Sequence, residues 1–384
     1  MTIKTKFAGL LAGAGALIVL GAGCAANNAT VNNASPTAVS KEPIKIGFMA
    51  PLTGDLAAVG ENIKAAVTIA RDEINAAGGV DGRPIDVIFE DEKCDAQAGV
   101  SAATKLLNVD KITALIGPAC SGVTLAVTPL AEPKKVPLIS PASTASTVTD
   151  AGDYVFRFVP ADTYQGKFGA EYLFNNLNKR KAAILFVNND YGVGLKDEFV
   201  DNFKRLGGTV VTAEGFAQDN YDLSAQLTKI KNSNPDVLYF VSYTEASIPG
   251  LVKAKQLGLN MTIFGADPWQ DPKIPQGAGV AAEGAMFSVP AVQNLPAEFI
   301  AKMKTLTGSD EIMSFAPRGY DILKAYAYVM GKVGADGETV KNELYNLKNY
   351  QGIADIYTMD KNGDMANSKY AVKEYKNGAI VEVK

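Results

Sequence analysis

The sequence predicts an α/β protein built as two doubly wound lobes around parallel sheets. Short apolar runs alternate along the chain with segments whose apolar residues recur at helical spacing, and this alternation is typical of βαβ units. The chain has 384 residues, of which 47% are hydrophobic and 20% charged, so it is long enough for two domains with cores of their own. Disordered and fibrous classes are therefore excluded.

The first lobe is predicted to begin near residue 44. Residues 45–50 form an apolar strand, and the apolar stripe from Ile63 to Ile74 recurs at helical spacing, which predicts a helix over 61–77. The alternation then continues through strand 85–90, helix 96–107, strand 113–116, helix 121–132 and strand 137–139.

A second series of the same kind follows residue 160 and predicts the second lobe. Helices return over 296–349, and two later Asn-Gly pairs, at 362–363 and 377–378, predict hairpin turns. The elements expected between residues 160 and 296 are helix 165–177, strand 182–187, helix 194–206, strand 209–214, helix 223–231, strand 237–241, helix 245–257 and strand 262–264.

We expect extended crossings to join the lobes as a multi-strand hinge, so that each lobe collects two separate stretches of the chain. The crossings are expected near 159–162, 285–289 and 353–360. The first lobe then takes 44–160 plus 290–354, and the second takes 161–289 plus 355–384.

The N-terminal residues predict export. Two lysines precede an apolar run over 7–20 that is too short for a stable membrane span, so residues 1–23 read as a signal peptide. The run ends in Leu-Gly-Ala-Gly before Cys24, which resembles the lipobox of bacterial lipoproteins and implies lipidation of Cys24. A plain signal peptide with a spectator cysteine is the alternative. Residues 24–43 are mostly Asn, Ala, Ser, Thr and Pro, so they predict a disordered tether between the membrane and the folded protein.

Composition excludes several function classes. The chain has no histidine, which removes Ser-His-Asp and Cys-His catalysis and imidazole metal sites. Lys plus Arg number 37 against 41 for Asp plus Glu, so the charge gives no reason to expect a nucleic-acid partner. No phosphate-cradling glycine motif follows a predicted strand. We therefore expect no enzyme activity, no cofactor and no metal.

The cysteine count points to one disulfide. If Cys24 is lipidated, Cys94 and Cys120 remain, an even number in a compartment where disulfides persist. These two cysteines are a natural pair.

Polar and aromatic residues follow several predicted strands at their C-terminal ends, where open α/β sheets bind ligands. Taken singly, each has a structural explanation as a helix cap, a half-buried aromatic or a turn residue. Together they predict a cleft whose hydroxyl and amide donors, carboxylate and aromatics suit a zwitterion with a side chain. These residues are Ser121, Ser143, Thr144, Tyr191, Tyr243, Asp267 and Trp269.

Five motifs carry a resemblance that extends over 44–384. They are Ile-Lys-Ile-Gly at 44–47 with Pro-Leu-Thr-Gly at 51–54, Glu-Ile-Asn-Ala-Ala-Gly-Gly-Val-Asp-Gly at 73–82, Asp-Glu-Lys-Cys-Asp at 91–95, Ile-Gly-Pro-Ala-Cys-Ser at 116–121, and Ser-Pro-Ala-Ser-Thr at 140–144. With these motifs the sequence resembles the periplasmic leucine/isoleucine/valine-binding proteins of ABC transporters, which have a type I periplasmic binding fold.

The resemblance implies roles for individual residues. In that family the two cysteines pair, an acid at the position of Asp267 helps to hold the ligand ammonium, and the side-chain pocket often has an aromatic residue where this chain has Val59. Trp269 is an unusually bulky neighbour of the acid. The remaining ligand positions implied are Ser121 with Ala142, Ser143 and Thr144 for the α-carboxylate and α-amino groups, and Asp162, Tyr191 and Tyr243 in the cleft.

The function expected is capture of an amino acid, a branched-chain or other apolar one first, by closure of the two lobes. The lipid-anchored extracytoplasmic protein would then deliver it to the permease and ATPase subunits of an ABC transporter. Two alternatives stay open, a ligand-sensing module that reports to a receptor and a protein that binds or acts on a small amide.

Overall fold

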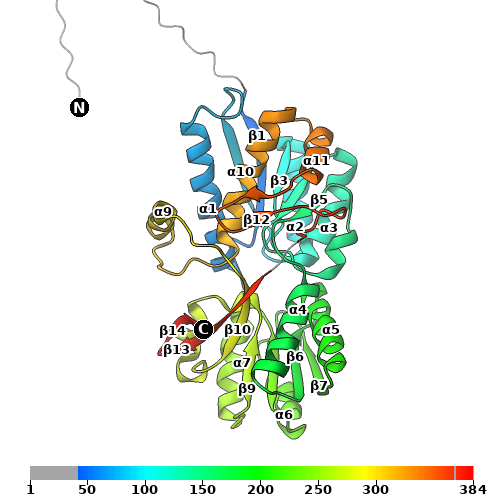
Figure 1. Ribbon diagram of the computed structural model, residues 1–384, viewed down its shortest axis with the longest axis vertical. Coiled ribbons are helices and arrows are strands. Elements are labelled where there is room, and N and C mark those ends of the chain that lie inside the picture. The colour runs from blue at the N-terminus through cyan, green and yellow to red at the C-terminus, as the bar shows by residue number, and fades with distance from the viewer. Residues whose placement is uncertain (1–41, 367–368, 384) are drawn as a thin grey trace, which may run out of the picture. The chain divides into compact units, whose positions relative to one another are not determined.

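The computed structural model describes residues 42–366 and 369–383, and it shows two lobes that each contain their own sheet (Figure 1). The expected signal peptide over 1–23, the expected lipidation site Cys24 and most of the expected tether over 24–43 lie outside the described residues.

The first lobe contains a sheet of five parallel strands, arranged in the order β2-β1-β3-β4-β5. Its central strands are buried along nearly their whole length because helices cover both faces, and this is why they read as continuous apolar runs. The strands are β1 (Ile44–Ala50), β2 (Ile85–Asp91), β3 (Ala114–Ile116), β4 (Leu138–Ser140) and β5 (Val155–Arg157).

The second lobe contains a mixed sheet of seven strands in the order β14-β13-β10-β9-β8-β6-β7, with antiparallel pairing only at the β13 edge. Asn377 and Gly378 join β13 to β14 with φ of 54° and 75°, as the Asn-Gly pair predicted. The strands are β6 (Lys181–Val187), β7 (Thr209–Phe216), β8 (Val237–Val241), β9 (Thr262–Gly265), β10 (Met286–Pro290), β13 (Tyr370–Lys376) and β14 (Ala379–Glu382), and a separate two-stranded ribbon is formed by β11 (Tyr350–Gln351) and β12 (Ile356–Tyr357).

No helix within 42–366 and 369–383 combines the length and apolar character needed to cross a bilayer. The helices are α1 (Ala57–Ala76), α2 (Ala96–Lys105), α3 (Ser121–Ala131), α4 (Asp162–Glu171), α5 (Asp190–Arg205), α6 (Ser224–Asn232), α7 (Thr244–Gln256), α8 (Lys273–Ala278), α9 (Ala297–Thr307), α10 (Ala316–Val333) and α11 (Gly337–Tyr345).

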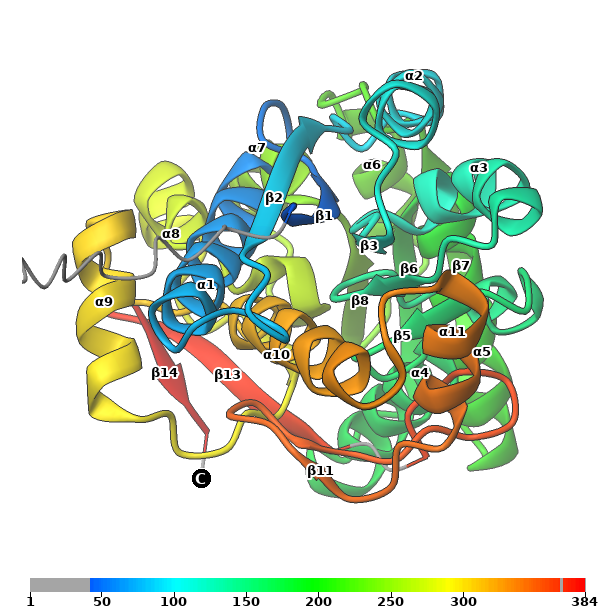
Figure 2. The ribbon, with the colours of Figure 1, turned by 90° about the horizontal axis from the view of Figure 1, so that it is seen from above.

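On the first sheet, α1 and α10 pack together on one face and α2 and α3 on the other (Figure 2). A Cβ on Gly319 would lie 2.7 Å from Cγ2 of Ile63, so glycine allows α10 to approach α1 closely. Helix α1 begins at Ala57, four residues before the expected start. Its first turn lies against the end of β1, where a Cβ on Gly60 would lie 1.8 Å from the carbonyl oxygen of Pro51. The sequence pattern missed this turn because its residues are small and carry little helical periodicity.

Two contacts bear on where the last crossing between the lobes lies. The ring of Tyr357 stacks on Phe158 with centroids 4.0 Å apart, and Asp364 forms an ion pair with the fully buried guanidinium of Arg157. Residues after the expected boundary at 354 therefore pack against the first lobe. We propose that this lobe extends to Asp364 and that the chain enters the second sheet only at β13.

Candidate ligand-binding site

A pocket lies between the two lobes at the carboxyl ends of the parallel strands. Its space amounts to about 390 Å³ with its open mouth included. Residues from both lobes line it. They are Pro51, Leu56, Val59, Ala119, Cys120, Ser121, Ala142, Thr144, Phe315, Tyr191, Tyr243, Asp267 and Pro268.

On the first-lobe side, the loop after β3 leads directly into α3, whose first residue is Ser121. The Ser121 hydroxyl accepts the backbone N–H of Ala145 at 3.1 Å, so its own proton stays available to a ligand oxygen. The first N–H groups of a helix have no acceptor within the helix and favour negative charge. The start of α3 is therefore suited to a carboxylate, and Ala142 and Thr144 line the pocket beside it.

Ser143 differs from its neighbours in the 142–144 corner. Its hydroxyl donates to the carbonyl oxygen of Pro118 at 3.1 Å and lies 2.7 Å from the Thr124 hydroxyl, while its N–H donates to the Ser140 hydroxyl at 2.9 Å. Ser143 is not part of the pocket lining. Its side chain ties the corner to the loop before α3, so the expected ligand contact is replaced by a structural role.

On the second-lobe side, three residues that follow different strands meet. The rings of Tyr191 and Tyr243 are stacked, with centroids 5.6 Å apart and an interplanar angle of 12°. The Tyr191 hydroxyl donates to Oδ1 of Asp267 at 2.9 Å, and the Asn189 amide donates to the Tyr243 hydroxyl at 3.2 Å. The two aromatic rings are therefore fixed beside a carboxylate.

The Asp267 carboxyl is the charged group of the pocket. It is only 3% exposed, and burial raises its pKa from 3.8 to about 7, although the hydrogen bond from Tyr191 acts in the opposite direction. No lysine or arginine occurs among the described residues that line the pocket. The ionised form of Asp267 therefore has no cation within the pocket lining, and the charge of the buried Arg318 acts on it from outside that lining.

Asp162 lies behind this site and is not part of the pocket lining. It is fully buried, and among the described residues no donor is in good hydrogen-bond geometry with either carboxyl oxygen, although the Thr144 side chain is close enough to act against the rise in its pKa. Burial raises its pKa well above the ordinary value, and the negative charge of Asp267 raises it further. Asp162, expected to contact the ligand in the cleft, is thus a buried acid close to Asp267.

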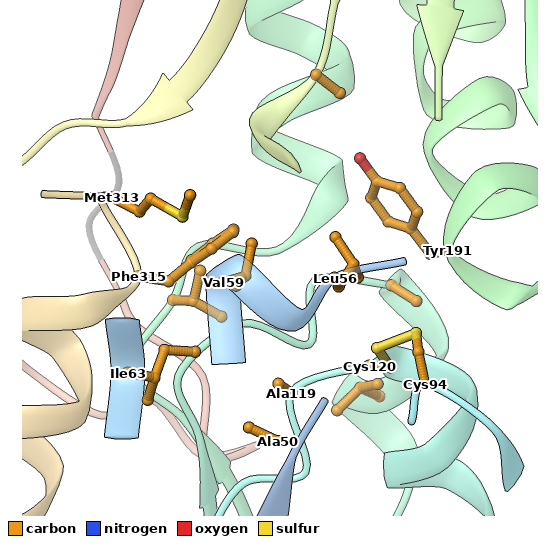
Figure 3. Packing of buried hydrophobic residues seen from close by; sticks show 14 of the residues in the cluster. Ala50, Leu56, Val59, Ile63, Cys94, Ala119, Cys120, Tyr191, Met313 and Phe315 are labelled. Carbon is orange, nitrogen blue, oxygen red and sulfur yellow. A yellow bond between two sulfur atoms is a disulfide. The ribbon is translucent and has the colours of Figure 1, made fainter. Parts of the chain in front are cut away.

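The remaining wall of the pocket is apolar. Val59 lies beside Phe315, with Leu56 and the Cys94–Cys120 disulfide further along the wall (Figure 3). The sequence offered no specific signal for Leu56 or Phe315, because each is an apolar residue just before a helix, where core residues are common. The structure brings Phe315 to the pocket from a segment nearly 200 residues away from the 117–122 loop.

Trp269 lies elsewhere. Its side chain is fully buried in the second lobe, where its indole N–H donates to the Ser242 hydroxyl at 3.0 Å and its ring packs at 79° against Phe240. A Cβ on Gly265 would lie 2.2 Å from the indole, so the ring is held tightly against β9. The expectation that Trp269 borders the ligand is corrected to a core position.

The disulfide lies at the edge of the pocket. Cys94 and Cys120 are bonded, with Cα atoms 5.4 Å apart, and the carbonyl of Cys94 accepts the Gln218 amide from the second lobe at 3.3 Å. The Tyr221 hydroxyl donates to Asp55 across the same rim at 2.7 Å. These contacts hold the lobes together at the mouth of the pocket.

No group of three or more possible metal ligands occurs in the described part of the chain.

Comparison with known proteins agrees with this architecture. A model of the periplasmic binding protein family matches residues 43–379. The chain is 29% identical over 356 residues to the leucine-, isoleucine-, valine-, threonine- and alanine-binding protein of Pseudomonas aeruginosa, covering 90% of this chain and 94% of that protein.

Solved structures give the same result. The leucine-binding protein LivK of Thermotoga maritima superposes with a TM-score of 0.83 at 29% identity, over 89% of this chain and 98% of that one. The branched-chain amino acid transporter substrate-binding protein LivJ of Streptococcus pneumoniae, in complex with isoleucine, gives a TM-score of 0.80 at 29% identity, over 89% and 99%. The chain therefore belongs to the periplasmic binding protein family, alongside the branched-chain amino acid-binding proteins, and it is an extracytoplasmic solute-binding protein rather than an enzyme.

Proposed function

We propose that this protein captures an amino acid with an apolar side chain, branched-chain aliphatic ones first, and delivers it to an ABC transporter permease. The observation that carries the proposal is the pairing of a buried carboxyl, Asp267, with a pocket that lacks a basic side chain. A buried carboxylate needs a partner, and a ligand ammonium would supply it.

The first lobe offers groups that suit the carboxylate of an amino-acid ligand. The Ser121 hydroxyl and the start of α3 provide donors for a carboxylate, while Asp267 lies on the second lobe. A ligand that carries both groups touches both lobes at once, so it favours the closed arrangement over an open one.

The side chain of the ligand would meet the apolar wall. Leu56, Val59 and Phe315 offer no hydrogen-bonding side-chain group, so a charged or amide side chain would lose its hydration there without compensation. The branched-chain specificities named for the relatives support an aliphatic ligand. An apolar pocket separates ligands that differ by one methylene by only about 1–3 kcal/mol, so several aliphatic amino acids should bind.

A thermal-shift screen against the common amino acids tests the proposal. We expect leucine, isoleucine and valine to give the largest increases in melting temperature, because a ligand at 100 times its Kd stabilises the folded state by about 2.7 kcal/mol. Glutamate and lysine serve as controls and should give no shift. The proposal fails if no amino acid stabilises the protein, or if a charged one does so best.

The membrane anchor is proposed from the sequence and has its own test. If Cys24 is lipidated, Cys24→Ser should release the exported protein from the membrane fraction or leave it unprocessed, because each buried methylene of the acyl chains contributes about 0.8 kcal/mol. Fractionation of cells that express either form measures this. Normal processing together with unchanged membrane association of the variant would show that Cys24 is not the anchor.

A further inference from the structure

Glu92 is a fully buried acid that does not line the pocket but contacts two residues of its wall. It directly follows β2, and its side chain is 0% exposed. Its Oε1 accepts the backbone N–H of Cys120 at 2.9 Å and that of Ala119 at 3.1 Å, and Oε2 lies 3.2 Å from the Ala119 nitrogen. Glu92 therefore serves as the acceptor for two consecutive buried amides.

Those two amides belong to the ligand site. Ala119 and Cys120 line the pocket and immediately precede Ser121, the first residue of α3. The N–H of Glu92 donates to the carbonyl oxygen of Ala50 at 3.2 Å, so the residue extends from the end of β2 past the end of β1 to the loop that follows β3. Glu92 thus fixes the loop that leads into the expected carboxylate-binding end of the site.

The carboxyl of Glu92 is not paired with a positive charge. No lysine or arginine of the described residues forms an ion pair with it, and the loop over 117–122 has no acidic or basic side chain. The charged or titratable groups around it are Asp91 and the exposed Lys93 on either side of it in the chain, Asp95 at the start of α2, whose N–H donates to the Glu92 carbonyl, and Tyr243 from the second lobe.

A buried carboxyl without a cation is more stable as the neutral acid. Burial raises the pKa of Glu92 to about 8, the two amides oppose this rise, and the charge of Asp91 adds to it. The neutral acid still accepts the two N–H bonds through its carbonyl oxygen. It does so without a negative charge behind the place where a ligand carboxylate would bind.

We propose that Glu92 is a positioning residue of the ligand site: in its neutral form it orients the Ala119–Cys120 backbone for the ligand carboxylate while adding no charge that would repel it. This inference rests on the proposed amino-acid ligand. It follows that ionisation of Glu92 weakens binding, and that ligand binding above pH 8 is accompanied by proton uptake at Glu92.

The first test is the Kd for leucine, measured by calorimetry from pH 6.5 to 9.5. E92Q resembles the neutral acid, so it should bind like the wild type near pH 7. Between pH 7 and 9.5 the wild type should lose about tenfold more affinity than E92Q, which corresponds to a one-unit rise in the pKa of Glu92 on binding. Titration of the ligand and of Asp267 is common to both proteins, so it cancels in the ratio of the wild-type Kd to the E92Q Kd at each pH.

Two further variants separate positioning from general stability. E92A removes the acceptor of two buried amides and should weaken leucine binding at pH 7 by about tenfold or more, and E92Q should restore it. The matched control is E90Q at the end of β2. The Glu90 carboxylate binds the Lys105 ammonium at 2.6 Å, and neither residue lines the pocket, so E90Q should follow the wild-type pH profile. Wild-type affinity in E92A, or equal pH profiles for E92Q and the wild type, would overturn the inference.

The wild type alone also gives a decisive result if the variants fail to fold. Calorimetry at pH 8.5 in two buffers of different ionisation enthalpy should show net proton uptake on leucine binding, and its absence would refute the role of Glu92. Failure of the proposed function is distinguishable, because then the wild type binds no amino acid at pH 7.

Discussion

Asp267→Asn should raise the Kd for leucine by about 30-fold or more at neutral pH. The substitution keeps the shape of the side chain and the hydrogen bond from Tyr191 but removes the negative charge that faces the ligand ammonium. Loss of one member of a buried charge pair costs roughly 2–5 kcal/mol, and 2 kcal/mol corresponds to about 30-fold in Kd. Isothermal titration calorimetry of both proteins with leucine measures the difference.

The same variant should make the empty protein more stable at pH 7 and above. The pKa of Asp267 rises from 3.8 to about 7 in the folded state, so the folded protein holds this proton more tightly than the unfolded chain. Between these two pKa values the unfolded state binds fewer protons, and the free energy of unfolding falls as the pH rises. The asparagine removes that loss. Urea denaturation of both ligand-free proteins at pH 5 and pH 7.5 should show the stability difference grow with pH.

Asp271→Asn is the matched control for Asp267→Asn. Asp271 is equally buried and follows the same strand, but it accepts the Thr244 hydroxyl at 2.9 Å and does not line the pocket. It should lower stability and leave the Kd for leucine nearly unchanged. If the two variants changed Kd equally, or if Asp267→Asn bound leucine like the wild type, Asp267 would be a turn residue without a ligand role.

Replacing both Cys94 and Cys120 by alanine should lower the free energy of unfolding by about 3–4 kcal/mol. The two residues are 26 positions apart, and closing a loop of that length restricts the unfolded chain by about this amount in the chain-entropy model. Urea denaturation should give the reduced wild type nearly the stability of the double variant. Reductant added to the double variant serves as the control and should change nothing.

The disulfide variant should also bind leucine more weakly. Cys120 lines the pocket, and Cys94 carries the carbonyl that accepts Gln218 across the rim, so the bond connects the ligand site to a contact between the lobes. Two reactive thiols in the unreduced, denatured wild type would contradict the bond itself. An unchanged Kd in the double variant would show that the pocket does not depend on it.

Much of the fold could be predicted because it follows from patterns within short stretches of sequence. Buried parallel strands appear as apolar runs, and Asn377-Gly378 forms its predicted hairpin because asparagine and glycine tolerate positive φ. The rule that ligands bind at the carboxyl ends of strands directed attention to Ser121, Tyr191 and Asp267, which the structure brings to one pocket.

Other features depend on contacts that no local pattern contains. Ser143 and Trp269 follow strands like the pocket residues do, but their side chains point toward Pro118 and Ser242. The later position proposed for the last crossing rests on the ion pair between Asp364 and Arg157, which joins residues more than 200 positions apart. Side-chain direction and long-range pairing are properties of the packed protein.

Whether one pocket binds both ends of a zwitterion can be decided by calorimetric titration with leucine and two analogues that each lack one charged group. In 2-hydroxy-4-methylpentanoate a hydroxyl replaces the ammonium, and 3-methylbutylamine lacks the carboxylate. We expect leucine to bind and each analogue to bind at least about 30-fold more weakly, since each leaves a buried polar partner unpaired at a cost of roughly 2 kcal/mol or more. Equal affinity for leucine and the hydroxy acid would contradict an ammonium site at Asp267, and with it the proposal that this pocket takes an amino acid.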